Sequence, residues 1–321
     1  MHNETSDVYT MNILKKKYTT IDVESNLIRV LDIHNASVQH YGEVKIHPDY
    51  LAQGVILNPE QVSSELSTLM KHLNSSRQNV LVSMNCFRLI TRFVTMPLLQ
   101  GGDLKEAVKW ALVHDIPVPL DTINVWWNVV EKNGNEQKVL IIGVPREALA
   151  ALYTTLYYAG ITPRAIDIKA IALTRVVKEQ TAIIIDIEDE TTSMIFKSGG
   201  IPVVAQTIHV KPSNAEIEDR LSLIQDELSR MVLYYNGTHP EKLIGTDTPV
   251  CLTGGLADTN VETHFIRITQ HPIIRTEAGL AFPDELPPGT YMVNFGLYLR
   301  EDKERRTLLY PDISRAVRFR K

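Results

Sequence analysis

The sequence of 321 residues contains only two cysteines, Cys86 and Cys251, and no long run of apolar residues. Two cysteines exclude a disulfide framework and a cysteine-rich zinc site, and they fit a reducing compartment. No segment approaches the ~20 consecutive apolar residues that a membrane-spanning helix needs, and the polar N-terminus has no signal-peptide pattern. We therefore expect a cytoplasmic protein.

The chain also lacks an excess of basic residues and the common catalytic motifs. Its formal net charge of -5 argues against a nucleic-acid-binding protein, because such proteins need a basic surface to displace counterions. The 10 histidines form no His-Glu-x-x-His ligand set, and no serine lies in a Gly-x-Ser-x-Gly elbow. We therefore predict no catalytic residue, no metal-binding residue and no nucleic-acid partner.

The sequence repeats one order of strands and helices in its two halves, and its size allows two lobes with separate cores. In the first half, apolar residues recur at helical spacing over residues 58–73, and a buried strand is expected at 79–84. The second half has a helical pattern over 214–235 and then a strand that runs into a glycine pair. The segment from about residue 97 to residue 162 predicts a small α+β insertion in the first lobe.

Two acidic turns about half a chain apart are the most informative feature. Ile21 to Asn26 and Ile185 to Thr192 each follow apolar β-branched residues and precede a second strand-like run, so each predicts a hairpin turn. Actin-like ATPases hold a nucleotide with a duplicated hairpin of this kind. In them Asp handles the metal or its waters, and a following Gly lets backbone N–H groups approach a phosphate. Here Glu24 and Glu188 stand where those glycines are expected.

The order of these motifs resembles the PilM family, the cytoplasmic actin-like proteins of type IV pilus assembly, which are related to FtsA. Asp22-Val23-Glu24-Ser25 stands where the family shows Asp-Ile-Gly-Ser, with Arg29 where Lys is usual, and Asp186-Ile187-Glu188 corresponds to the second turn. The family's adenosine motif and closing segment resemble Leu252-Thr253-Gly254-Gly255-Leu256 and Val293 to Arg300. The resemblance runs from about Thr20 to Arg300.

The resemblance implies an α/β, actin-like (ribonuclease H-like) fold of two lobes with an FtsA-type inserted subdomain in the first lobe. The expected domains are a first lobe at 11–96 and 163–180, an inserted subdomain at 97–162, a second lobe at 181–300 and a basic C-terminal tail at 301–321. A vestigial nucleotide site is expected at Asp22, Glu24, Ser25, Asn26, Arg29, Asp186, Glu188, Asp189, Thr191, Thr192, Gly254, Gly255 and Leu256.

The resemblance also implies a scaffold rather than an enzyme. PilM-like proteins bind the short N-terminal tail of PilN, an inner-membrane protein, in a groove between the first lobe and the inserted subdomain. We therefore expect an adaptor at the inner face of the cell membrane that contacts the membrane only indirectly, meets other pilus platform components and is a possible homo-oligomer. No cofactor is expected, because a carboxylate about 4 Å from a phosphate charge costs about 4 kcal/mol at an effective dielectric near 20.

Alternatives remain open from the sequence alone. One is an active actin-like ATPase or sugar-kinase relative that holds ATP and Mg²⁺ in the cleft between the lobes. Another is a relative of the cytoplasmic part of the type II secretion component GspL, although the chain has no transmembrane helix. The glutamates could also face solvent as in ordinary surface turns. The basic tail, with Arg315, Arg318, Arg320 and Lys321, could assist binding at an anionic membrane.

Overall fold

The computed structural model describes residues 17–85, 89–115, 119–210, 217–239, 243–257, 259–276 and 279–301. The predicted basic tail, apart from its first residue, lies outside the described residues, and so does Cys86. Within the described part of the chain, no helix is both long enough and apolar enough to cross a membrane.

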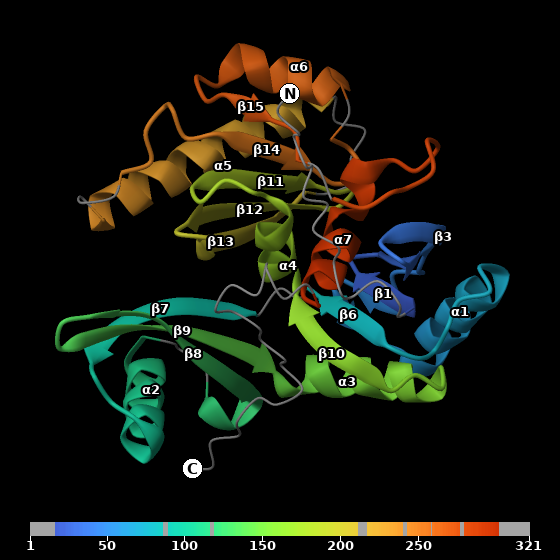
Figure 1. Cartoon of the computed structure of the whole chain (residues 1–321), viewed down its shortest axis with the longest axis horizontal. Coiled ribbons are helices and arrows are strands. Elements are labelled where there is room, and N and C mark those ends of the chain that lie inside the picture. Colours follow the sequence, from blue (N-terminus) through green and yellow to red (C-terminus); the bar gives the residue numbers. More distant parts are fainter. Residues whose placement is uncertain are drawn as a thin grey trace, which may run out of the picture.

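Two five-stranded sheets with the same strand order form the cores of two lobes (Figure 1). Each sheet has three consecutive antiparallel strands followed by two parallel ones, in the orders β3-β2-β1-β6-β10 and β13-β12-β11-β14-β15. The first sheet consists of β1 (Lys17–Val23), β2 (Leu27–His34), β3 (Ser37–Lys45), β6 (Val80–Met84) and β10 (Pro163–Ile168). The second consists of β11 (Ala182–Ile187), β12 (Thr191–Ser198), β13 (Ile201–His209), β14 (Val250–Thr253) and β15 (Ile273–Ile274). The two-lobed α/β fold expected from the sequence is confirmed.

Helices cover these sheets, two of them where the apolar spacing predicts a helix. In α1 (Pro59–His72), the Asn58 side chain accepts a hydrogen bond from the Gln61 N–H at 3.2 Å and so caps the helix. The apolar face of α1 is buried beside α3 (Arg146–Tyr158) in the core of the first lobe. The second lobe carries α5 (Ile217–Thr238) and α6 (Thr259–Ile268). A short hairpin of β4 (Leu51–Ala52) and β5 (Val55–Ile56) precedes α1.

Two short helices, α4 (Lys169–Val176) and α7 (Met292–Leu299), lie between the two sheets (Figure 1). They touch at the backbone, because a Cβ added to Gly296 would lie 2.0 Å from the carbonyl oxygen of Ala172. Apolar side chains of both lobes pack around this crossing in one core cluster, which includes Leu31 of β2 and Ile184 of β11. The sequence did not predict α4, yet this helix joins the lobes.

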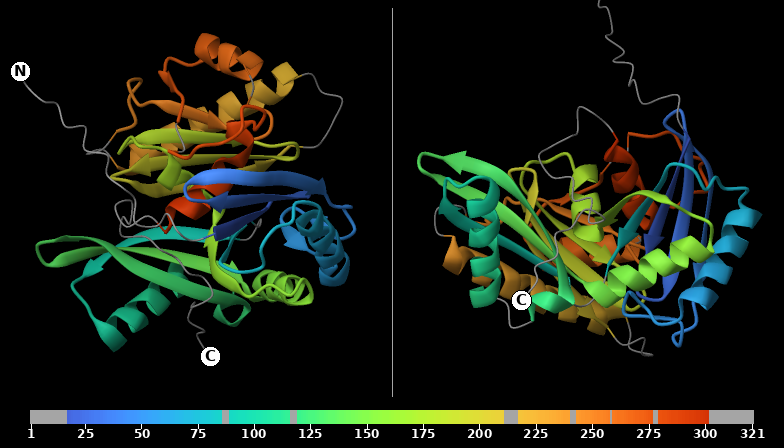
Figure 2. Two further views of the ribbon diagram at one scale, coloured as in Figure 1. Left: turned by 45° about the vertical axis from the view of Figure 1, so that its right-hand side comes forward. Right: turned by 90° about the horizontal axis from the view of Figure 1, so that it is seen from below.

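The inserted part of the first lobe is a three-stranded sheet with α2 (Gly101–Asp115) on the face turned away from the second lobe (Figures 1 and 2). Its strand order is β7-β9-β8, where β7 is Ile90–Pro97, β9 is Glu136–Pro145 and β8 is Ile123–Asn133. Both faces pack apolar cores. Trp126 packs against the core of the first lobe, and Trp127 packs against the core under α2.

This sheet differs in extent from the predicted insertion of residues 97–162. It begins at residue 90, because β7 pairs with β9 along its whole length. The helix α3 packs into the main core of the first lobe beside α1. The helix α2 of the insertion begins at Gly101, and Asp103 lies in its first turn. Two 3₁₀ turns complete the described structure, η1 (Leu120–Thr122) and η2 (Pro288–Tyr291).

Candidate functional site in the cleft between the lobes

Both acidic turns point into the cleft between the lobes, where the first aspartate and the first glutamate of each turn are buried. Glu24, after β1, has 0% of its surface exposed, and Glu188, after β11, has 3% exposed. The alternative that these glutamates face solvent is therefore wrong. The buried cluster, which we call the cleft cluster, consists of Asp22, Glu24, Arg29, Lys169, Asp186 and Glu188.

Lys169 joins the two turns. It is the first residue of α4, and only 2% of its surface is exposed. Its ammonium group forms short ion pairs with Glu24 of the first lobe and with Asp186 of the second. The hydroxyl of Thr191, in the second lobe, donates a hydrogen bond to Glu24 Oε1 at 3.1 Å. Glu24 is therefore held by a lysine and a threonine instead of by solvent.

Arg29 makes the second connection between the lobes. Its Nη1 and Nη2 lie 2.6 and 2.7 Å from the two carboxylate oxygens of Glu188, which is the bidentate geometry that arginine and carboxylate prefer. Its Nε donates to Glu43 Oε2 on β3 at 3.0 Å. Arg29 lies on β2 and Glu188 on the opposite turn, so this pair spans the cleft beside the one made by Lys169.

The charges of these groups depend on one another. Burial alone favours the neutral form of Glu24, but the charge and hydrogen bond of Lys169 outweigh burial and lower the pKa of Glu24. Burial likewise disfavours charged Lys169, yet Asp186 and Glu24 raise its pKa above the usual value. Asp22 differs from both, because neither of its oxygens receives a hydrogen bond from the described residues. Burial, followed by the charge of Glu24, raises the pKa of Asp22 to about 7.

Three of the four carboxylates in the cleft cluster are paired with the chain's own cations. Oxygen atoms of Glu24, Asp186 and Glu188 lie within 4.8 Å of one another, which is a spacing suited to a cation, but Lys169 and Arg29 already pair with them. One backbone N–H group of each turn is also engaged: Glu24 donates to the Leu27 carbonyl and Glu188 to the Thr191 carbonyl, each at 2.9 Å. Such N–H groups form the phosphate cradle in nucleotide-binding turns.

The predicted glycine pair lies directly against the cleft cluster. Gly254 has φ +99°, and a Cβ there would lie 2.4 Å from the carbonyl oxygen of Ile187, so packing alone requires glycine. A Cβ on Gly255 would lie 3.1 Å from Arg29 Nη2. The next residue, Leu256, donates its N–H to the Ile187 carbonyl at 3.0 Å. On the outer side, a hollow of about 450 Å³ adjoins the pair and is lined by Arg275, Pro287 and Pro288, among others.

The other predicted site residues have smaller parts. Asp189 forms an exposed ion pair with Lys45 at 3.0 Å, and Thr192 is fully buried. Ser25 lines a cavity of about 110 Å³, and Asn26 is the next residue in the turn after β1.

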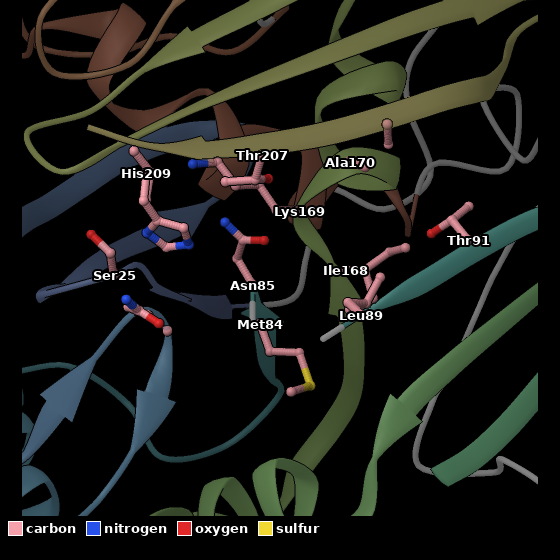
Figure 3. A pocket seen from close by; sticks show the side chains of 14 residues that line it. Ser25, Met84, Asn85, Leu89, Thr91, Ile168, Lys169, Ala170, Thr207 and His209 are labelled. Carbon is pink, nitrogen blue, oxygen red and sulfur yellow. The ribbon is translucent and has the colours of Figure 1, made fainter. Parts of the chain in front are cut away.

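This cavity lies where the first lobe, the inserted sheet and the second lobe meet (Figure 3). Met84 and Asn85 line it at the end of β6, Thr91 on β7, and Thr207 and His209 on β13. Its volume is below the roughly 300–1,000 Å³ of small-molecule pockets. The cavity therefore suits a side chain or a chain end rather than a nucleotide.

Two residues of the site escaped the sequence analysis. Lys169 follows Ile166-Asp167-Ile168 and precedes Ala170-Ile171-Ala172, and a lysine in such an apolar run signals a buried, paired charge. Arg220, near the start of α5, donates to the backbone carbonyls of Glu188, Asp189 and Thr191 and so holds the second turn in place. No local pattern marks Arg220, because its partners lie about 30 residues away.

Comparisons with known proteins agree with the resemblance drawn from the motifs. The profile of the family described as type IV pilus assembly protein PilM matches residues 20–211, which is more than half of the chain. The chain is similar to the solved PilM-PilN type IV pilus biogenesis complex, with a TM-score of 0.75 and 16% identity over 88% of this chain and 98% of that one.

More distant solved structures share the fold. One is the ethanolamine utilization protein EutJ from Carboxydothermus hydrogenoformans, with a TM-score of 0.52 and 12% identity over 88% of this chain and 89% of that one. Another is the cytoplasmic domain of EpsL, an inner-membrane component of the type II secretion system of Vibrio cholerae, with a TM-score of 0.50 and 11% identity over 93% and 98%. The expected actin-like fold is confirmed.

Proposed function

The chain belongs to the PilM family of type IV pilus assembly proteins, and we propose that it acts in pilus assembly as an adaptor that needs no nucleotide. Its partner is the N-terminal tail of a PilN-like inner-membrane protein, since the most similar fold among the structures described above comes from a PilM-PilN complex. Through this partner the protein is held at the inner face of the membrane beside other platform components. Self-association stays a prediction.

The observation that carries the proposal is the closed state of the cleft. In an actin-like ATPase, the two turns leave space and N–H groups for the phosphates. In this chain Glu24 and Glu188 fill the same region, and each forms an ion pair with a buried cation. A nucleotide would have to break both ion pairs and separate the side chains. We therefore infer that partner binding, not turnover, is the function.

The cavity at the junction of the three sheets is where we place the partner's chain end. It lies between the end of β6 in the first lobe and the start of β7 in the inserted sheet, as expected for a groove between these parts. Met84 and Leu89 offer apolar surface, and Asn85, Thr91 and His209 are polar. A short peptide with one apolar side chain near its end would match this lining.

The test is binding of a PilN-type N-terminal peptide to the purified chain, followed by fluorescence anisotropy. Thr91→Arg should weaken binding at least tenfold, because the longer side chain enters the cavity. Thr95→Arg is the matched control, since Thr95 lies on the same strand but is exposed and does not line the cavity. Equal weakening by both variants, or no binding by the folded wild type, would overturn the proposal.

A second candidate function is the Mg²⁺-dependent ATPase. Two observations favour it: Asp22 has no hydrogen-bond partner among the described residues, and a hollow adjoins Gly254 and Gly255. An active enzyme should release phosphate from ATP above background, and peptide affinity should change when Mg²⁺ and ATP are added. The adaptor should show neither effect.

A further inference from the structure

We infer that Lys169 and Arg29 are built-in cations that hold the two lobes together in place of a bound nucleotide and metal ion. This inference rests on the proposed nucleotide-independent role and adds a physical mechanism to it. In this mechanism, closure of the lobes is a permanent property of the chain, because the groups that bridge the cleft are its own side chains.

The geometry of Lys169 supports the inference first. Its ammonium group contacts both Glu24 in the first lobe and Asp186 in the second. Oxygen atoms of these two carboxylates and of Glu188 lie within 4.8 Å of one another. The ammonium group therefore neutralises an acidic pocket of the kind that hard divalent cations occupy.

The charge balance supports it second. The cleft cluster contains four carboxyl groups, on Asp22, Glu24, Asp186 and Glu188, and two cations. Removing one partner of a buried ion pair is strongly destabilising, since the charge left behind has no compensation. Without the ammonium group, the lobes should move apart or the pocket should recruit another cation.

An exposed ion pair provides the matched control. Lys45 on β3 contacts Asp189 in the second turn at 3.0 Å, so it also connects the two lobes. Its side chain is 70% exposed and that of Asp189 is 43% exposed. Water can replace this pair at little cost. If any interlobe ion pair were sufficient for closure, loss of Lys45 would have the same effect as loss of Lys169.

The experiment compares hydrogen exchange and Mn²⁺ binding in wild type, Lys169→Met and Lys45→Met. In wild type, we expect slow amide exchange in the β1–β2 and β11–β12 turns, unchanged by Mg²⁺ and ATP. In Lys169→Met, exchange in both turns should become at least tenfold faster. Mn²⁺ should bind this variant at least tenfold more tightly than wild type and slow the exchange again. Lys45→Met should behave as wild type.

Two results would overturn the inference: unchanged exchange in folded Lys169→Met, or slower exchange in wild type on addition of Mg²⁺ and ATP. If Lys169→Met does not fold, the charge-matched variant Lys169→Met/Glu24→Gln replaces it, because it loses one cation and one anion together. Slow exchange in the turns of that variant would also overturn the inference. Failure of the adaptor proposal is detected separately, by loss of peptide binding in wild type.

Discussion

Replacing Glu24 and Glu188 together by glycine is expected to create a site for Mg²⁺-bound ATP in the cleft. In wild type, both glutamates pair with buried cations. Their removal releases Lys169 from Glu24 and Arg29 from Glu188, so both cations can contact phosphate groups while Lys169 still pairs with Asp186 and Arg29 with Glu43. Asp22 stays in place for a metal ion. Glycine also restores to both turns the backbone freedom that close approach to a phosphate requires.

The size of the effect follows from the charges. A carboxylate about 4 Å from one phosphate charge costs about 4 kcal/mol at an effective dielectric near 20, or roughly three powers of ten in affinity. Each glutamate is already partly neutralised by its cation, so only part of this energy is recovered. We expect wild type to bind ATP more weakly than about 100 µM and the double variant to bind between about tenfold and a thousandfold more tightly.

Isothermal titration calorimetry with ATP, with and without Mg²⁺, measures the difference. Glu190→Gly is the control, because it removes a carboxylate from the second turn without breaking an ion pair of the cleft cluster, and it should bind ATP as weakly as wild type. Low-micromolar affinity in wild type would refute the reasoning. So would a folded double variant whose affinity equals that of wild type, because the glutamates would then not be the obstacle.

Two further predictions concern stability. Gly296→Ala should lower the free energy of unfolding by about 1–3 kcal/mol, because the new methyl group forces α4 and α7 apart at Ala172. The control is Gly237→Ala, at an open position in α5, which should raise the free energy of unfolding by up to about 1 kcal/mol. Thermal unfolding of the two variants and wild type measures both effects. Asp22→Asn should remove a pH dependence of the free energy of unfolding. Because the pKa of Asp22 is raised to about 7, the folded state keeps a proton that the unfolded chain has lost, and wild-type stability falls as pH rises from about 4 to about 7. Urea unfolding at about pH 5 and about pH 8 should show the variant gaining up to about 3 kcal/mol relative to wild type at the higher pH, whereas equal slopes would contradict the assignment.

The fold could be predicted from the sequence because its signals are local. The hairpin strands of both lobes are rich in β-branched residues and are buried along almost their whole length, and α1 has regular apolar spacing with a capping residue in front. Such patterns depend on neighbours within a few residues. The start of the inserted sheet was misplaced because β7 acquires its partner, β9, only about 45 residues later in the chain.

The cleft cluster could be predicted only in part, for a physical reason. The sequence places aspartate and glutamate residues in both turns, but it does not show which cation each of them meets. Glu24 pairs with a residue 145 positions away, and Arg29 with one 159 positions away. When the cation partners are unknown, the sequence predicts only that the glutamates repel a phosphate or face solvent. Pairing with residues far away in the sequence decides whether the glutamate side chains are buried or exposed, and only the tertiary fold shows this pairing.

A fixed cleft has a consequence for the partner site. The cavity is lined by Met84 and Thr91 on one side and by Thr207 and His209 of the second lobe on the other, so its shape depends on how far the lobes are closed. Lys169 lines the same cavity while it bridges Glu24 and Asp186. If side chains rather than a nucleotide maintain closure, the cavity keeps one shape at every ATP concentration. Peptide affinity should then be unaffected by ATP in wild type. It should decrease in Lys169→Met, which alters both the closure of the lobes and one residue of the cavity lining while β7 and β13 are unchanged.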